Sequence, residues 1–74
     1  MNEVQREMRE FIVADIVENT DLDGDTVRDQ LMFNGPVRAH GETWTSFTWI
    51  EEDGHDTILV RYDLTTRSYV IGSY

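Results

Sequence analysis

Three aspartates at alternate positions are the first residues of this 74-residue chain whose spacing suggests chemistry. Asp21, Asp23 and Asp25 match the start of a calcium-binding loop, in which carboxylate oxygens ligate the ion. Such a loop also needs a glycine at its sixth position and a glutamate at its twelfth, where this chain has Thr26 and Met32. We therefore expect no metal site, and interpret the segment as an acidic turn in which Asp23 or Asp25 caps a helix.

Catalytic residues and cofactors are not expected either. The two histidines, His40 and His55, and the serines stand at no spacing typical of a nucleophile, its base and an orienting group. The chain has no cysteine, which excludes thiolate zinc sites, and no glycine-rich phosphate loop. These observations favour a protein that binds a partner over an enzyme.

Charge is the strongest signal in the composition. The chain has 15 acidic residues against six basic ones, all of them arginine, and a formal net charge of −9. A field of this sign repels phosphate backbones and attracts basic surfaces. Three interpretations stay open: solubility alone, a salt-adapted or high-GC source, and imitation of nucleic acid. The clustered acids are Asp21, Asp23, Asp25 and Asp29 within residues 15–29, and Glu51, Glu52, Asp53 and Asp56 further along.

A first helix is predicted over residues 2–19, which are good helix formers. Its apolar stripe consists of Val4, Met8, Phe11 and Ile12. Asp15 falls on the centre line of that stripe, so the helix either breaks near residues 12–14 or is contacted on a different side further along. Whether residues 2–33 form two helices or three is open.

A second helix is predicted over about residues 25–33, with Val27 and Leu31 pointing inward and Met32 as a further candidate. The tripeptide Asn34-Gly35-Pro36 predicts the end of that helix, because proline cannot continue it. Residues 37–40 are either a short strand or a connection.

From Thr43 onward the residue types are typical of strands, and two turns divide them. Asp53-Gly54 predicts a hairpin turn. Centred there, the register gives the pairs Trp49–Ile58 and Phe47–Val60 and the unfavourable pair Glu51–Asp56. A second turn at residues 64–67 gives the pairs Tyr62–Tyr69 and Val60–Ile71.

The two predicted registers sort the aromatic and aliphatic residues onto two faces. The face that the helices should cover carries Phe47, Trp49, Ile58, Val60, Tyr62, Tyr69 and Ile71. The opposite face carries Trp44, Ile50, Leu59 and Val70. Two helices cannot cover both faces of a three-stranded sheet, so we expect the second face to expose apolar surface that includes Trp44.

The predicted fold is α+β, with one or two N-terminal helices packed on one face of a three-stranded antiparallel β-meander. We expect a single domain, residues 1–74, with a helical half over 1–36 and a sheet half over 37–74. No apolar run approaches the ~18 residues that a membrane span needs. Residues 1–5 are polar and acidic, unlike a signal peptide. We therefore expect a cytoplasmic protein with no membrane partner.

Residues 14–31 resemble the helix-turn-helix pattern of many transcription factors. Its apolar contact positions are occupied by Val17, Leu22, Val27 and Leu31. The resemblance implies a winged-helix-like DNA-binding regulator, with the following hairpin as the wing. A helix that enters the major groove needs positive charge, however, and residues 15–29 hold six acids against one arginine. Direct nucleic-acid binding is therefore the alternative hypothesis, for a salt-adapted host.

The leading hypothesis is a small acidic module that binds another protein as an inhibitor or adaptor. In size, charge and lack of cysteine the chain is similar to phage-encoded anti-restriction and anti-CRISPR inhibitors. That resemblance implies a viral nucleic-acid mimic acting in the host cytoplasm on a basic nucleic-acid-handling protein. The acidic clusters would steer the two together. The predicted anchors are Trp44, Ile50 and Leu59. A third hypothesis is a structural or assembly protein that forms homodimers through its sheet.

Overall fold

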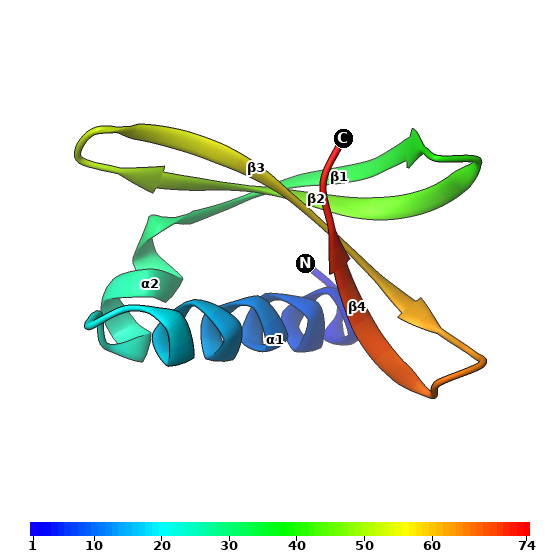
Figure 1. Cartoon of the computed structure of the whole chain (residues 1–74), viewed down its shortest axis with the longest axis horizontal. Coiled ribbons are helices and arrows are strands. Elements are labelled where there is room, and N and C mark those ends of the chain that lie inside the picture. The colour runs from blue at the N-terminus through cyan, green and yellow to red at the C-terminus, as the bar shows by residue number, and fades with distance from the viewer.

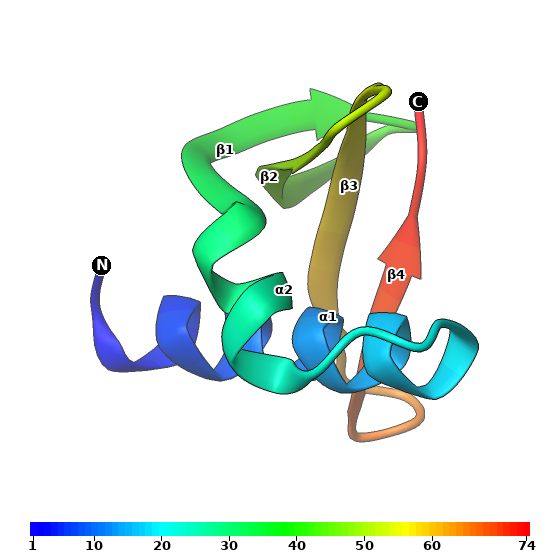
Figure 2. The same cartoon turned by 90° about the vertical axis from the view of Figure 1, so that its left-hand side faces the viewer.

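The computed structural model describes all 74 residues as two helices followed by four strands. The elements are α1 (Glu3–Asn19), α2 (Gly24–Gln30), β1 (Leu31–Ala39), β2 (Glu42–Glu51), β3 (Gly54–Asp63) and β4 (Ser68–Gly72). The strands form one antiparallel sheet in the order β1-β2-β3-β4. Figure 1 shows α1 lying along one side of this sheet, and Figure 2 shows β1 and β4 at its opposite edges. The α+β class is confirmed.

Helix α1 is continuous, so residues 2–33 contain two helices. Asn2 caps its start: the Asn2 side chain accepts from the Gln5 backbone N–H, and the Gln5 side chain accepts from that of Asn2. The helix does not break near residues 12–14. Its buried residues are Met8, Ile12, Val13 and Ile16. Asp15 is exposed, because the C-terminal half of α1 turns a different side toward the core.

The prediction of a three-stranded sheet is wrong by one strand. Strand β1 covers residues 31–39. The sequence predicted the end of a helix over residues 31–33 and either a short strand or a connection over residues 37–40. Leu31 pairs with Trp49 of β2, and pairing with a neighbouring strand here prevails over the helix propensity of the segment. The sheet half of the chain therefore begins at residue 31 and not at residue 37.

Asn34-Gly35-Pro36 is a bulge within β1 and not a helix stop. Phe33 pairs with Phe47 and Gly35 with Ser46, which leaves Asn34 as the extra residue. Gly35 has a φ of +114°, a conformation that glycine adopts without strain. The Asn34 side chain donates to the hydroxyls of Ser46 and Thr48, at 3.2 and 2.8 Å, and so holds the bulge against β2.

The first hairpin register is two residues away from the predicted one. Glu51 pairs with Gly54, so the turn consists of Glu52 and Asp53. Trp49 lies opposite Asp56, and the expected repulsive pair Glu51–Asp56 does not form. A shift of two residues keeps every side chain on its predicted face. The second register is confirmed, with the pairs Tyr62–Tyr69 and Val60–Ile71.

The core lies between the helices and the sheet, and each layer contributes to it. Ile12 from α1, Val27 from α2, Phe47 from β2 and Val60 from β3 have no exposed surface. Burial of each of these apolar side chains away from water stabilises the fold by about 1.5–3 kcal/mol. Trp49, Ile58 and Tyr69 pack against this cluster from the same face of the sheet, as predicted.

The part of the second face around Trp44 closes on itself, which corrects the expectation that Trp44 is exposed, whereas Ile50 and Met32 on the same face stay about half exposed. Only 7% of Trp44 is accessible, and Leu59 on the same face is fully buried. The Trp44 ring packs on Gly72 of β4, and its Nε1–H donates to the carbonyl oxygen of Ala39 at 2.9 Å. The guanidinium of Arg61 lies 5.0 Å from the ring centroid.

Curling of the sheet explains this burial. His40 occupies the β1–β2 turn, and its Nε2 lies 2.6 Å from the carbonyl oxygen of Ser73, just after β4. The first turn therefore reaches the last strand, although β1 and β4 do not pair. Figure 2 shows this turn near the C-terminal end of the chain. A strongly twisted sheet buries one tryptophan without a further layer of helices.

An ion pair joins the two helices. Arg28 of α2 donates to the Glu10 carboxylate of α1 through Nε at 2.8 Å and through Nη2 at 2.6 Å, and to Asp25 through Nη1. The hydrogen-bonded guanidinium holds the pKa of Glu10 below its usual value. The pair fixes the position of α2, whose last residue contacts the sheet.

The packing of Trp44 on Gly72 can be tested by adding one methyl group. A Cβ at Gly72 would lie 2.8 Å from Cη2 of Trp44, so Gly72→Ala should lower the free energy of unfolding by about 1–3 kcal/mol through overpacking. Urea unfolding measures this. In the chain that carries Gly72→Ala, the additional change Trp44→Phe should recover part of the lost free energy of unfolding. The exposed neighbour Ser73→Ala is the control, and an equal effect of both alanines would contradict the contact.

The Glu10–Arg28 pair predicts how stability depends on pH. Because the folded pKa of Glu10 is depressed, its contribution is complete above the usual value of 4.5 and is lost as the pH falls through the folded pKa. The difference in unfolding free energy between wild type and Glu10→Gln should therefore be constant near neutral pH and shrink toward pH 3. With Arg28→Gln in both chains, most of this pH dependence should disappear, and only the smaller part that Arg9 supplies should remain. A difference that persists unchanged at low pH would refute the pairing.

Candidate partner-binding surface

Trp49 stands between two surface hollows and lines both. We call the first the central groove; it lies between α1 and the sheet and has a volume of about 330 Å³. The second, the tip hollow, lies between the helices and the β2–β3 turn and measures about 530 Å³. The indole Nε1–H donates to Oε1 of Gln30, the last residue of α2, at 2.8 Å. This bond fixes the ring as the wall between the hollows.

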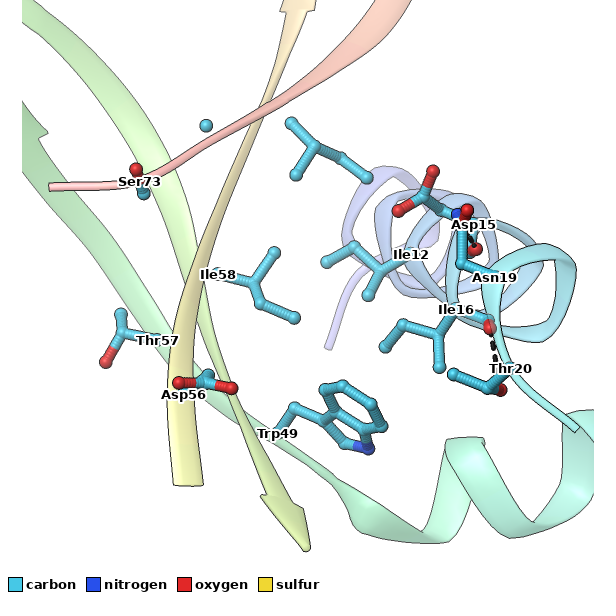
Figure 3. Close-up of a pocket in the computed structure, with 12 residues that line it drawn as sticks. Ile12, Asp15, Ile16, Asn19, Thr20, Trp49, Asp56, Thr57, Ile58 and Ser73 are labelled. Atoms are coloured by element: carbon cyan, nitrogen blue, oxygen red, sulfur yellow. Dashed lines mark hydrogen bonds between the residues drawn. The ribbon is translucent and has the colours of Figure 1, made fainter. Parts of the chain in front are cut away.

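The central groove has an apolar floor and a polar rim. Its floor is formed by Ile12, Ile16, Trp49, Ile58 and Ile71. Figure 3 shows Ile12 and Ile16 of α1 and Ile58 of β3 pointing into one space, with Trp49 beside them. Asp15 and Asn19 line the helix side of the groove, and Asp56 and Thr57 line the strand side. An apolar cavity with a few polar groups at its rim is a common form of binding site.

The tip hollow brings the two acidic regions of the chain together. Thr20, Leu22, Thr26 and Gln30 line it from the helical side. Glu51, Glu52 and Asp53 line it from the β2–β3 turn. The acidic turn therefore lies beside the end of α1 and the start of α2. We call Asp15, Glu51, Glu52, Asp53 and Asp56, together with Trp49, the acidic face.

No arginine lines either hollow. Arg9 and Arg28 bond to Glu10, Arg61 pairs with Glu42 at 3.0 Å, and Arg38 donates to Thr43 at 3.1 Å. Arg6 lines a separate hollow beside Phe11 and Tyr69. Arg67 is the last residue of the β3–β4 turn. The residues that line the two hollows thus include acidic side chains but no arginine.

The other four predicted acidic residues have different roles or places. Asp23 caps α2 by accepting from the Thr26 backbone N–H at 2.7 Å, which lowers the pKa of Asp23. Asp25 pairs with Arg28. Asp21 and Asp29 are exposed but line neither hollow. The structure therefore joins the turn acids with Asp15 and leaves Asp21, Asp23, Asp25 and Asp29 outside the acidic face.

The predicted apolar anchors do not form one accessible surface. Trp44 and Leu59 are buried, for the reason given above, so neither offers a contact to a partner. Ile50 is 47% exposed, but it points to the opposite face of β2 from Trp49 because successive side chains alternate. The accessible tryptophan beside the acids is Trp49.

Sequence reasoning missed the roles of Trp49 and Asp15. Trp49 was assigned to the covered face, correctly, but the groove left beside it was not foreseen. Asp15 did carry a signal, because it interrupts the apolar stripe of α1. An acid at that position marks the place where the helix surface leaves the core and becomes the rim of a groove.

Helix α2 does not present the surface of a DNA-reading helix. It has seven residues, and its one basic side chain, Arg28, is directed to Glu10 and Asp25. Its exposed residues include Asp25 and Asp29. This arrangement offers no positive charge to a phosphate backbone.

The structure groups no three histidine, aspartate or glutamate side chains closely enough to hold a metal ion. Neither helix is long and apolar enough to cross a membrane. Comparison with protein-family models, with curated protein sequences and with solved structures gave no match.

Proposed function

We propose that this chain is a protein-binding module, an inhibitor or adaptor, that engages a basic nucleic-acid-handling protein through the acidic face. The observation that carries the proposal is the meeting of the β2–β3 turn with the helical half around Trp49, with no arginine between them. Five carboxylates on one side of a small domain attract the basic surface that would otherwise hold phosphates.

The acidic face also has what a binding site needs besides charge. Charge raises the association rate and selects a partner whose surface carries the opposite charge, whereas buried aromatic contacts supply most of the affinity. Trp49 is partly accessible and held in place by its bond to Gln30. A rigid tryptophan among carboxylates combines both contributions. Trp49 therefore replaces Trp44 as the proposed anchor.

The experiment uses the competition that such a protein would exert. Basic proteins of a bacterial extract are retained on DNA-cellulose, and the purified chain is added to displace them. Wild type should release a discrete set of proteins at low salt and release less as salt is added, because the contact is electrostatic. Glu51→Gln with Glu52→Gln should need about tenfold more protein for the same release.

The control removes equal charge elsewhere. Glu3 and Glu18 are exposed on α1 and line neither the central groove nor the tip hollow. Glu3→Gln with Glu18→Gln leaves the same formal charge as the test variant, −9 + 2 = −7, and should release proteins as wild type does. Equal weakening of both variants would show that bulk charge acts and not the acidic face. No release by wild type would refute the proposed partner class.

A further inference from the structure

We propose that the central groove binds an arginine side chain from a basic segment of the partner protein, with the aliphatic stem on the isoleucine floor and the guanidinium at the carboxylate rim. The inference rests on the protein-binding role proposed above and names the chemistry that the groove selects. It commits to a peptide arginine as the occupant, and other occupants are outcomes of the test.

The floor and rim of the groove match the two parts of an arginine side chain. An arginine buries its methylene stem along apolar surface while its charged end stays at a polar boundary. Trp49, Ile58 and Ile71 offer the accessible apolar surface of the groove, and the buried Ile12 and Ile16 lie beneath it. Asp15 and Asp56 stand on the two sides of the rim, one on α1 and one on β3. A purely apolar side chain would leave these carboxylates partly desolvated and without a counter-charge.

The wall of the groove favours a guanidinium over an ammonium group. Trp49 lies at the same end of the groove as Asp56, which pairs with it across the β2–β3 ladder. A planar guanidinium stacks on an aromatic ring and bonds to a carboxylate at the same time, whereas the ammonium of lysine is a compact, strongly hydrated charge. A volume of about 330 Å³ is at the lower end of ligand pockets, which suits one side chain and not a large ligand.

The chain itself leaves the groove without a cation. Arg9, Arg28 and Arg61 are held by Glu10 and Glu42, and none of the six arginines lines the groove. The negative potential at the rim is therefore available to a cation from outside. Charge complementarity of this kind determines that the partner segment is positively charged and where its charge lies on the groove.

The test is an NMR titration of the full chain with a capped peptide that carries one arginine between two leucines. Binding should shift the indole N–H of Trp49 and the backbone amides of Asp15, Ile16 and Ile58. The same peptide with citrulline, which keeps the shape but lacks the charge, should bind at least about tenfold more weakly. The lysine peptide should bind about threefold to tenfold more weakly.

Matched protein variants locate the site. Asp15→Asn with Asp56→Asn should weaken the arginine peptide about tenfold, whereas Glu3→Gln with Glu18→Gln should leave its affinity unchanged. Equal affinity for the citrulline peptide would overturn the inference, because it would show an apolar groove without cation selection. Shifts spread over the surface that leave Trp49 unmoved would overturn it as well.

The failure of this inference and that of the proposed function are distinguishable. Arginine-peptide binding in the groove, with no protein displaced from DNA-cellulose, would support the groove and refute the partner class. Displacement that depends on Glu51 and Glu52, with no peptide binding and no effect of Asp15→Asn with Asp56→Asn, would refute the groove and retain the function.

Discussion

The transition from helix to strand at Leu31 determines where the acidic turn lies. Helix α2 ends at Gln30, and the next residue already pairs with Trp49 of β2. Helix α2 and the β1–β2 hairpin are thereby joined without a linker. The Gln30 side chain also bonds to the indole of Trp49. Because β2 is held in this register, its turn residues lie beside the end of α1. The acidic face depends on that connection more than on any single charge.

A chain of 74 residues has little core to hold such a surface in place. Here two clusters of unequal size share the task. The larger one packs Ile12, Val27, Phe47 and Val60 between helices and sheet. The smaller one encloses Trp44 as the sheet curls, with His40 reaching Ser73. Burying Trp44 on the second face leaves Trp49 as the accessible indole on the first. The packing that stabilises the sheet thus also selects the candidate anchor.

Local patterns predicted the first helix, the covered face of the sheet and the β3–β4 register, because each depends on residues that are near in the chain. They did not predict β1 over residues 31–36, and over residues 37–40 they left open a short strand or a connection. Leu31 and Phe33 read as the end of a helix, and only pairing with β2 makes them a strand. The turn at His40-Gly41 was also missed. Both of its residues have positive φ, as a type I′ hairpin turn requires. A prediction that omits most of β1 leads to a flat three-stranded sheet and to an exposed Trp44.

The sequence predicted an acidic binding surface, but it did not predict which acidic residues form that surface. The turn acids Glu51, Glu52 and Asp53 were identified from their clustering, and they do line a hollow. The aspartates near α2 were grouped with them by density alone, yet Asp23 and Asp25 are committed to a cap and an ion pair. The group to which each carboxylate bonds depends on the direction of its side chain. The spacing of the acids in the sequence does not determine that direction. Asp15 joins the acidic face through the groove, which exists only in the folded chain.

Fluorescence quenching of Trp49 tests the central claim most directly, because the claim concerns the charge around an accessible indole. In the Trp44→Phe chain Trp49 is the only tryptophan. Caesium should quench it strongly and iodide weakly at low salt, since a negative field concentrates cations and excludes anions. Glu51→Gln with Glu52→Gln should reduce this asymmetry more than Glu3→Gln with Glu18→Gln does. Equal quenching by the two ions, or equal effects of the two variants, would contradict an acidic face centred on Trp49.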